Sequence, residues 1–332
     1  MSPAYRDAGV DTEAAAKAVA LIADLAASVR TPEVADQVGG FAGLYRIGEG
    51  RLLAAATDGV GTKLEIARQT GRLNTVGIDL VAMCADDVAC TGAEPLFFLD
   101  YLAVGRVEPT RVASLVEGVV EGCRRAGCAL LGGETAEHPG VMEEDVFDLA
   151  GFCVGMVNEA DLLGPHRVAE GDVVVGLASS GLHANGYSWV RSALLQRFDL
   201  DHTPPGLDRP LADELLEPCA IYAPAVVSLA RDGLIHAAAH ITGGGVFENL
   251  PRVLPDGLGA TIHRGTWLEH PIFGLMQEAS GASDDDMFAA FNMGVGMLLL
   301  VAPESVEDVL ARHSHEASRI GDVSSPSGVR LV

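Results

Sequence analysis

The chain has only two lysines among its 332 residues, Lys17 and Lys63, and the other 20 basic residues are all arginines. Aromatic residues make up only 5%, and 46 acidic against 22 basic residues give a formal charge of −24. This charge repels nucleic acid and anionic membranes, and the sequence has no basic stripe with interleaved aromatic residues. We therefore expect neither nucleic acid nor a membrane as a partner.

Long hydrophobic runs and paired cysteine motifs are also absent. No stretch of about 18 uncharged apolar residues occurs, and no charged segment followed by an apolar one begins the chain. The cysteines form no Cys-x-x-Cys pair and have no histidines at zinc-ligand spacing. We expect free buried thiols in a reducing compartment, and hence a soluble cytoplasmic protein.

The length favours two domains of roughly 150 residues each, and 48% hydrophobic residues are enough for two cores. A Gly-Pro break at 164–165 and the polar run 167–172 mark the boundary, which divides the chain into 1–167 and 168–332. No convincing internal repeat is present.

Both halves alternate strand and helix patterns, which predicts an α/β (α+β) protein with two mixed α/β domains. In the first half, we expect helices at 11–28, 80–91 and 109–126 and strands at 52–56, 75–78, 96–104, 128–131 and 145–157. In the second, we expect strands at 173–178, 238–241 and 291–301 and helices around Trp189, at 247–253 and at 303–313.

Residues 57–63 (Thr-Asp-Gly-Val-Gly-Thr-Lys) resemble a phosphate-binding loop. An ammonium is a compact point charge suited to a phosphate oxygen, and glycines let the backbone approach a ligand. The segment is not a Walker A loop, because Thr62 precedes Lys63 and Leu64 follows it. A carboxylate beside a phosphate-binding lysine is costly unless a cation lies between them, so Asp58 indicates a metal with a nucleotide. The alternative is a tight turn with an incidental lysine.

Carboxylates recur where the expected strands of the first half end, which is where α/β folds assemble ligand sites. They are Asp58, Asp79, Asp86, Asp87, Asp100, Glu134 and Glu137. Mg²⁺ takes one or two carboxylates plus phosphates in most sites, so about two to four of these are candidate ligands. The rest are expected to be caps or solvated residues. Asp58 and Asp79 are the better candidates because expected strands lead into them.

Glycine loops at 179–186 and 243–245 precede expected helices and could offer backbone amides to an anion. A plain turn explains such loops equally well. His183 lies in the first loop and could relay a proton, although a lone histidine is more often structural. Cys84 and Cys90 lie on an apolar helical face and are expected to be core residues.

Eight ordered strings resemble the phosphoribosylformylglycinamidine cyclo-ligases, which are the aminoimidazole ribonucleotide synthetases of purine biosynthesis. They are 5–10 (Tyr-Arg-Asp-Ala-Gly-Val), 57–63, 77–84 (Gly-Ile-Asp-Leu-Val-Ala-Met-Cys), 92–101 (Gly-Ala-Glu-Pro-Leu-Phe-Phe-Leu-Asp-Tyr), 132–137 (Gly-Gly-Glu-Thr-Ala-Glu), 151–155 (Gly-Phe-Cys-Val-Gly), 240–245 (His-Ile-Thr-Gly-Gly-Gly) and 291–297 (Phe-Asn-Met-Gly-Val-Gly-Met). The resemblance therefore covers nearly the whole chain. The chain departs from the family pattern at Asp86, where Asn is usual, and at Ala184, where Ser is usual.

The resemblance implies ATP-dependent closure of the imidazole ring of formylglycinamidine ribonucleotide, giving aminoimidazole ribonucleotide, ADP and phosphate. An O-phosphorylated imidate would supply the leaving group. The resemblance also implies a homodimer in which strands of the N-terminal domains form a shared barrel.

The roles that the resemblance implies can be given by residue. Mg²⁺ would be held by Asp58, Asp79, Asp87 and Glu134. ATP would contact Asp58, Gly59, Gly61, Thr62, Lys63, Asp79, Gly132, Gly133 and Glu134. The substrate would contact Gly181, His183, Asn185, Gly186, Thr242, Gly243, Gly244, Gly245 and Asn292. Catalytic roles fall to Asp58, to Lys63 as the group that neutralises the transferred phosphoryl, and to His183 as the proton-transfer candidate.

Two alternatives remain at this point. Selenophosphate synthetase and thiamine-monophosphate kinase share the two-half architecture, but the first usually carries an N-terminal reactive Cys or selenocysteine near a lysine, and here the first cysteine is Cys84. A nucleotide-binding regulatory protein that has lost the chemistry is the other alternative, and intact Asp58, Lys63, Asp79 and Glu134 argue against it.

Overall fold

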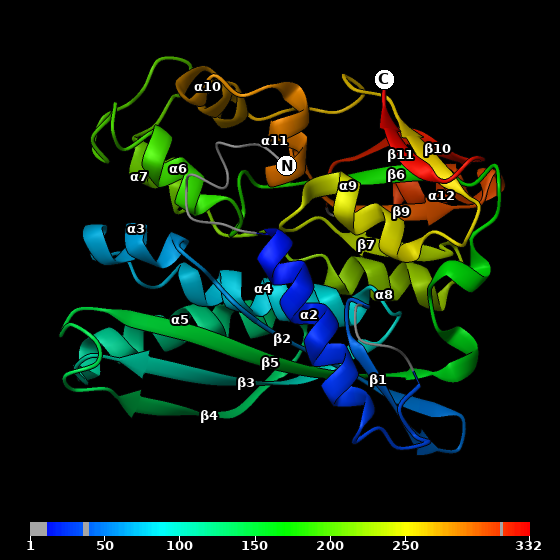
Figure 1. Cartoon of the computed structure of the whole chain (residues 1–332), viewed down its shortest axis with the longest axis horizontal. Coiled ribbons are helices and arrows are strands. Elements are labelled where there is room, and N and C mark those ends of the chain that lie inside the picture. The colour runs from blue at the N-terminus through cyan, green and yellow to red at the C-terminus, as the bar shows by residue number, and fades with distance from the viewer. Residues whose placement is uncertain (1–11, 36–39, 313–314) are drawn as a thin grey trace.

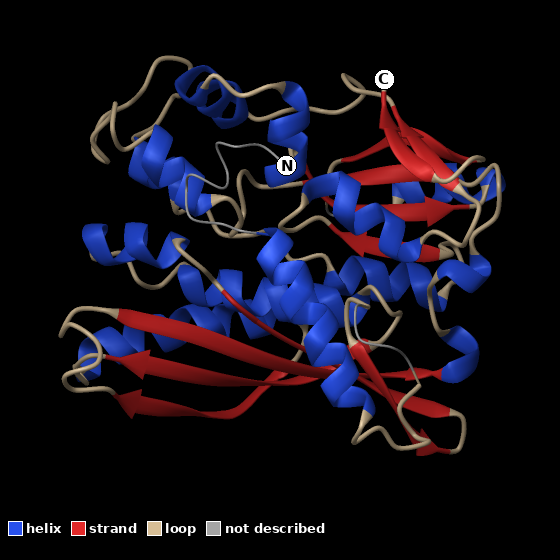
Figure 2. Cartoon of the chain, in the orientation of Figure 1, coloured by secondary structure: helices blue, strands red, loops and turns tan. Residues whose placement is uncertain are grey.

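The computed structural model describes residues 12–35, 40–312 and 315–332 and contains two sheets, one in each half of the chain (Figures 1 and 2). The string 5–10 lies outside the described residues. The first sheet has the order β1-β2-β5-β3-β4, and only β3 and β4 run parallel. Its strands are β1 (Gly43–Gly48), β2 (Arg51–Gly59), β3 (Glu94–Val104), β4 (Ala129–Glu137) and β5 (Phe147–Asn158).

Helices α4 (Val76–Ala89) and α5 (Pro109–Ala126) cover one face of this sheet, and α2 (Thr12–Ala27) and α3 (Lys63–Thr70) complete the first half. Alternate strand residues such as Leu102 and Leu149 are buried beneath α4 and α5. The two helices cross closely: a Cβ on Gly77 would lie 2.3 Å from the Val119 nitrogen, so only glycine fits there.

The second half holds a six-stranded sheet of order β11-β8-β10-β6-β9-β7, in which only β11 and β8 run parallel. Its strands are β6 (Val173–Ala178), β7 (Ala237–His240), β8 (Gly259–Ile262), β9 (Val295–Val301), β10 (Ala317–Ser324) and β11 (Gly328–Leu331). Its α-helices are α6 (Tyr187–Ala193), α7 (Leu211–Leu215), α8 (Ala223–Arg231), α9 (Gly245–Asn249), α10 (Pro271–Ser280), α11 (Asp284–Ala290) and α12 (Val306–Ala311). Short 3₁₀ turns are η1 (Glu159–Asp161), η2 (Pro165–Arg167), η3 (Leu250–Val253) and η4 (Pro303–Ser305).

Several expected elements are confirmed, and one is wrong. The strand at 173–178 and the helix at 109–126 match β6 and α5. The strand expected at 75–78 does not exist, because Val76 begins α4, and Asp79 therefore lies in the first turn of a helix. Every residue of α4 except Asp87 is buried, so the helix shows no amphipathic period. The strand expected to open at residue 291 begins only at Val295, after two residues with positive φ.

Helix α4 is also the main contact between the halves, since it lies between the first sheet and α8 (Figure 1). Asp86 of α4 accepts hydrogen bonds from the backbone N–H groups of Tyr222 (2.8 Å) and Ala223 (2.7 Å) at the start of α8. The proposed boundary at 167/168 falls in the connection between β5 and β6. Among the described residues, no helix combines the length and apolar content needed to cross a bilayer.

Candidate functional site between the two halves

Three loops of the second half meet at one edge of its sheet: the loop after β6, the loop after β7 and the segment before β9. Asn292 joins the first and third, because its Nδ2 donates to the Gly181 carbonyl (2.9 Å) while its Oδ1 accepts from Ser179 Oγ (3.0 Å) and Gly294 N (2.9 Å). The Asn292 amide is thus committed to holding the loops in place, which is a structural role and not the expected contact with substrate.

The glycines of these loops divide into two groups. A Cβ on Gly186 would lie 2.2 Å from the Phe291 ring, and one on Gly245 would lie 1.8 Å from the Phe288 carbonyl oxygen. Tight packing with positive φ explains these two. Gly243 differs: it is exposed, and the nearest atom to its Cβ position is Asn185 Oδ1 at 3.5 Å. Gly243 and Asn185 therefore form an accessible part of the predicted substrate site.

The loop 57–63 of the first half reaches the loop after β6, as is required if ATP and the substrate bind next to each other. Thr62 Oγ1 and Ser188 Oγ share a hydrogen bond of 3.1 Å. Lys63 Nζ donates to the backbone carbonyls of His183 (3.0 Å) and Glu217 (2.7 Å). The predicted phosphate loop and the predicted substrate loop are therefore neighbours.

Lys63 and Asp79 nevertheless have a different arrangement from the expected one. Lys63 Nζ lies 2.9 Å from Asp79 Oδ2, and both side chains are fully buried. With two carbonyls and one carboxylate, all three N–H groups of the ammonium are used. Asp79 also accepts from Cys219 N at 2.7 Å. Burial opposes the charged form of Lys63, but the charge and hydrogen bond of Asp79, together with Tyr187 and Cys219, outweigh this effect and raise the pKa of Lys63.

This pairing corrects two assignments. In the described conformation Lys63 has no N–H left for a phosphate, and Asp79 is occupied by Lys63 and a backbone amide and does not face an open metal site. Both residues join the halves of the chain.

His183 is buried in the turn after β6 with a positive φ of 63°. Its Nε2 accepts from the backbone N–H groups of Ser180 (3.2 Å) and Ala220 (3.4 Å). Burial, followed by the charges of His240 and Lys63, holds the pKa of His183 well below its ordinary value. The imidazole is therefore neutral and faces the protein interior, which is an arrangement typical of a structural histidine and not of a proton relay.

Asp58, Asp87 and His240 come together at the boundary, where β2, α4 and β7 approach one another. His240 Nδ1 lies 3.0 Å from Asp87 Oδ1. Although solvent reaches Asp58, the surrounding protein desolvates it and raises its pKa; the Gly59 amide opposes this rise and the Asp87 charge adds to it. Burial of His240 opposes its protonation, but the Asp87 hydrogen bond and the nearby carboxylates raise its pKa overall. The sequence contained a signal for His240, since it ends a strand two residues before Thr242 of the Thr-Gly-Gly-Gly segment.

Glu134 lies on the other face of the first sheet from Asp58. The row Asp58–Gly151–Asp100–Gly133 crosses the sheet on its helix-covered side. Glu134 is opposite Tyr101, one residue further along, and so points to the uncovered side. Within one chain, Glu134 cannot share an ion with Asp58, and Gly132 and Gly133 lie on this same exposed strand, away from Lys63.

The remaining carboxylates suit a particular kind of metal site. Among the described residues, no three His, Cys, Asp or Glu side chains are arranged to hold a metal ion by themselves. Asp87 lies close enough to Asp58 for its charge to disfavour the charged form of Asp58. Mg²⁺ commonly uses one or two carboxylates and completes its shell with phosphate oxygens and water. The Asp58–Asp87 pair fits that requirement.

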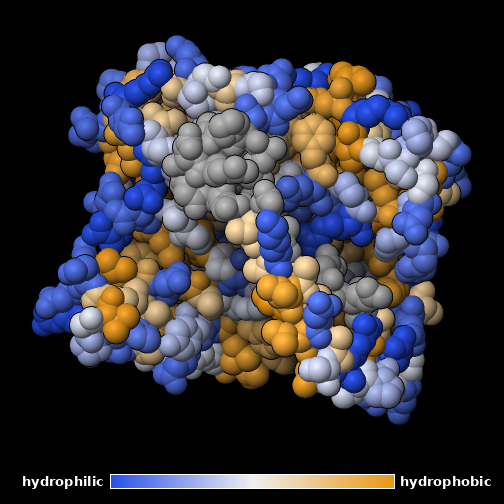
Figure 3. Space-filling model, viewed as in Figure 1, coloured by the Kyte–Doolittle hydropathy of each residue, from blue (hydrophilic) through white to orange (hydrophobic). Residues whose placement is uncertain are grey.

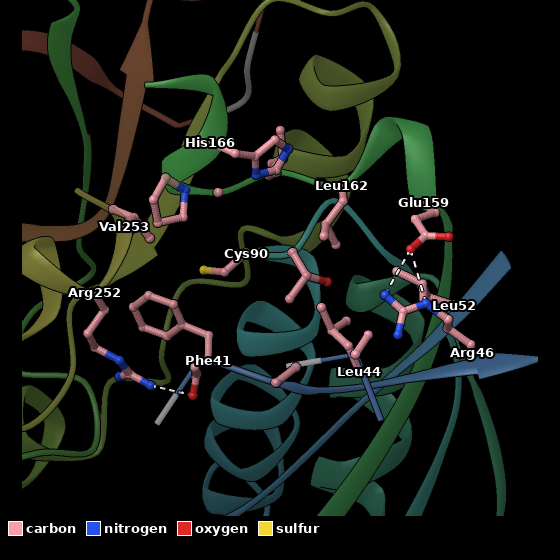
Figure 4. Close-up of a pocket in the computed structure, with 17 residues that line it drawn as sticks. Phe41, Leu44, Arg46, Leu52, Cys90, Glu159, Leu162, His166, Arg252 and Val253 are labelled. Atoms are coloured by element: carbon pink, nitrogen blue, oxygen red, sulfur yellow. Dashed lines mark hydrogen bonds and ion pairs between the residues drawn. The ribbon is translucent and has the colours of Figure 1, made fainter. Parts of the chain in front are cut away.

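A cavity of about 250 Å³ opens one helical turn from Asp87, with Cys90 in its wall (Figure 4). The Arg252 guanidinium lies 3.8 Å from the centre of the Phe41 ring and donates to the Gly40 carbonyl (2.6 Å). Across the cavity, Arg46 pairs with Glu159 (3.0 Å). The cavity joins residues from both halves of the chain and is smaller than a typical site for a whole nucleotide.

Comparison with known proteins identifies relatives of the whole chain. The sequence model "AIR synthase related protein, N-terminal domain" matches residues 39–157, and "AIR synthase related protein, C-terminal domain" matches 169–332. Phosphoribosylformylglycinamidine cyclo-ligases are similar to the chain in Geotalea daltonii (48% identity, covering 93% of this chain and 91% of that protein), Geobacillus kaustophilus (46%, 100% and 99%) and Myxococcus xanthus (48%, 99% and 98%).

Solved structures share the fold at low sequence identity. Thiamine-monophosphate kinase from Stenotrophomonas maltophilia superposes with a TM-score of 0.62 at 18% identity, covering 92% of this chain and 93% of that one. AaThiL complexed with AMPPCP and TMP gives 0.66 at 17% identity, covering 94% and 92%. These two likenesses support the two-domain mixed α/β fold alone, whereas the relatives at 46–48% identity favour the cyclo-ligase family over the kinase alternative.

Proposed function

The chain belongs to the phosphoribosylformylglycinamidine cyclo-ligase family, and on that premise we propose how its own residues carry out the reaction. The family reaction is the ATP-dependent closure of formylglycinamidine ribonucleotide to aminoimidazole ribonucleotide, a step of purine biosynthesis. The chain is accordingly an enzyme. The residue roles, the metal and the assembly below are proposals.

The observation that carries the proposal is the juxtaposition of Asp58 and Asp87 beside the loops of the second half. Two carboxylates that repel each other are stabilised when a cation and phosphates lie between them. We assign Mg²⁺ on the ATP phosphates to Asp58 and Asp87; when bound, it neutralises charge on the transferring phosphoryl group. His240 occupies one oxygen of Asp87 and orients the other, which makes His240 a positioning residue.

The chemistry requires a leaving group, because the formyl amide oxygen leaves poorly. Transfer of the γ-phosphoryl group to that oxygen gives an imidate phosphate, and attack of the amidine-side nitrogen on the same carbon expels phosphate. Such a reaction asks the protein mainly to position the reactants and to balance charge. We place the substrate's phosphate at Thr242 and Gly243 beside Asn185, the accessible part of the second-half loops.

The test is ADP release and aminoimidazole ribonucleotide formation from ATP, Mg²⁺ and formylglycinamidine ribonucleotide, as Mg²⁺ is varied. Asp58→Asn and Asp87→Asn are expected to raise the Mg²⁺ concentration for half-maximal rate by about 10–100-fold. Asp256→Asn, at an exposed carboxylate of the second half, is the matched control and should leave it unchanged. An unchanged Mg²⁺ dependence in both site variants would refute the metal assignment. Absence of substrate-dependent ADP from the folded parent protein would refute the function.

The uncovered face of the first sheet supports a homodimer. Tyr45, Tyr101 and Phe152 lie on this face and are 40–44% exposed, and the strand register places Leu53 and Leu99 between them. Exposed apolar faces of strands are normally covered. We propose that a second copy covers it, strand face against strand face, as in the shared barrel that the family resemblance implies. The free state of all six cysteines supports a reducing, cytoplasmic location.

A further inference from the structure

Three cysteines, which have no role in the proposed reaction, lie near one another where α5 packs on the first sheet. Cys123 lies in the last turn of α5, Cys128 directly precedes β4, and Cys153 lies on β5. All three are free thiols. Cys123 and Cys153 are buried (3% and 0% exposed), whereas Cys128 is only partly buried. Cys128 is therefore the most accessible residue of this cluster.

The end of α5 brings Cys123 and Cys128 together. Gly127 has a φ of 76°, and Cys128 N donates to the Cys123 carbonyl at 3.0 Å. This bond, from the residue after the left-handed glycine back to the residue five positions earlier, defines a Schellman ending. The side chains of these two residues commonly contact each other in such an ending. The backbone thus places the two thiols side by side, as a disulfide requires.

The surroundings make Cys128 the most nucleophilic thiol of the three. Hydrogen bonds from the thiols of Cys123 and Cys153 stabilise its thiolate and lower the pKa of Cys128. The same hydrogen bonds, followed by burial, raise the pKa of Cys123 and of Cys153, which keep their protons. In the described part of the chain no three metal-ligating side chains are arranged to hold an ion, so the three thiols do not form a metal site by themselves.

We propose that Cys128 is an oxidant-sensitive thiol that forms a disulfide with Cys123 when a hydroperoxide reaches it. The Cys128 thiolate attacks the O–O bond of hydrogen peroxide, which is reduced to hydroxide and becomes water on protonation, and the sulfur becomes a sulfenic acid. The Cys123 thiol then attacks that sulfur and releases a second water. Two thiols and one peroxide give one disulfide and two waters. The bond would tie the end of α5 to the start of β4, the strand that carries Gly132, Gly133 and Glu134.

Peptide mapping of the full chain tests the pairing directly. The protein is treated with hydrogen peroxide, blocked with N-ethylmaleimide and digested with trypsin. Cleavage after Arg124 and Arg125 separates Cys123, in peptide 112–124, from Cys128 and Cys153, both in peptide 126–167. We expect the two peptides cross-linked, with a mass about 2 Da below the sum of reduced peptide 112–124 and a peptide 126–167 that carries N-ethylmaleimide on its remaining cysteine. A disulfide confined to peptide 126–167, or no disulfide while other cysteines oxidise, would overturn the proposal.

Single substitutions identify the reacting sulfurs. Cys128→Ser should abolish the cross-link, whereas Cys153→Ser and the control Cys219→Ser, at a buried thiol outside the cluster, should retain it. Cys123→Ser removes the resolving thiol, so Cys128 should then be labelled by dimedone as a sulfenic acid. The labelling experiment uses Cys123→Ser alone, so it requires only that this variant folds. Failure of dimedone to label Cys128 in folded Cys123→Ser would contradict the assignment of Cys128 as the reactive thiol.

Discussion

Lys63 of the first half and Asp79 at the start of α4 form a fully buried ion pair, with Nζ 2.9 Å from Oδ2. The ammonium also binds the carbonyls of His183 and Glu217 in the second half. Lys63, one of only two lysines in the chain, therefore connects loop 57–63, α4 and the second half. A buried charge whose partner is removed is far more costly than the pair is stabilising.

Lys63→Met is therefore expected to lower the free energy of unfolding by about 3–5 kcal/mol, because Asp79 is left buried without its cation. Lys63→Met combined with Asp79→Asn should recover part of this loss, since an amide oxygen can still accept from Cys219 N. Urea unfolding followed by circular dichroism measures both. Lys17→Met on the exposed α2 serves as the control. Equal stability of the single and double variants would contradict a coupled pair.

Asp86 predicts an unusual pH dependence of stability. Its Oδ1 caps the start of α8, and its Oδ2 has no hydrogen-bond partner among the residues that the structure describes. Burial raises the pKa of Asp86 to about 7, against the opposing effects of His240 and the two amides. From about pH 4 to pH 7 the folded state therefore holds a proton that the unfolded state has released, and the free energy of unfolding falls as pH rises.

Asp86→Asn keeps the accepting oxygen and removes the charge. The unfolding free energy of Asp86→Asn minus that of the parent chain should therefore increase by about 1–3 kcal/mol between pH 5 and pH 8. Unfolding is measured in EDTA, so that no cation binds near Asp87. For Asp256→Asn, at an exposed site, the unfolding free energy should change with pH in the same way as that of the parent chain. A constant difference between Asp86→Asn and the parent across this range would show that Asp86 is ionised throughout.

His183 provides a test of the proton-relay hypothesis. Since its imidazole is buried, neutral and hydrogen-bonded to two backbone amides, it should not titrate in the pH range of activity. His183→Asn tolerates the positive φ, because asparagine adopts this conformation readily. We expect kcat to fall through movement of the loop, while the apparent pKa values of the kcat–pH profile between pH 6 and 9 stay the same. Loss of one limb of that profile would restore His183 as an acid–base group.

The sequence predicted local structure better than it predicted the partners of the site residues. Strands with clear turns at both ends, such as β6, and a helix with Pro at its start, such as α5, could be located from pattern alone. The helix expected at 80–91 overlaps most of α4, but its first turn at 76–79 was taken for a strand, because a segment buried on nearly all sides shows no amphipathic period that marks its start. Lys63 was identified as special, but its partners are residues 79, 183 and 217, and only the tertiary fold brings these together.

The face on which Glu134 lies shows a second limit. Successive strand residues alternate between the two faces of a sheet, so one inserted residue reverses every later assignment. The register between β3 and β4 shifts between Phe98 and Leu99, and this irregularity determines that Glu134 lies opposite Tyr101 on the uncovered face. No residue type in the string 132–137 signals the shift, so the expected grouping of Glu134 with Asp58 could not be corrected from sequence.

The proposed homodimer predicts a specific sensitivity of that uncovered face. Figure 3 shows other apolar surface where α2 crosses the first sheet, and Leu21 and Leu25 of α2 are exposed there, so exposure alone does not identify the interface. Phe152 lies on the central strand β5 of the uncovered face, between Thr57 and Leu99. A carboxylate at this position would be desolvated without a partner on dimerisation, which costs several kcal/mol.

Phe152→Asp is therefore expected to convert a dimer of the parent chain into a monomer, measured by light scattering after size exclusion at the same protein concentration. Leu268→Asp is the matched control, because Leu268 is a more exposed apolar side chain (62% against 40%) in the second half, away from the first sheet. It should leave the mass unchanged. If the dimer persists in Phe152→Asp but is lost in Leu268→Asp, the interface lies on the second half instead. A monomeric parent chain would exclude the shared barrel altogether.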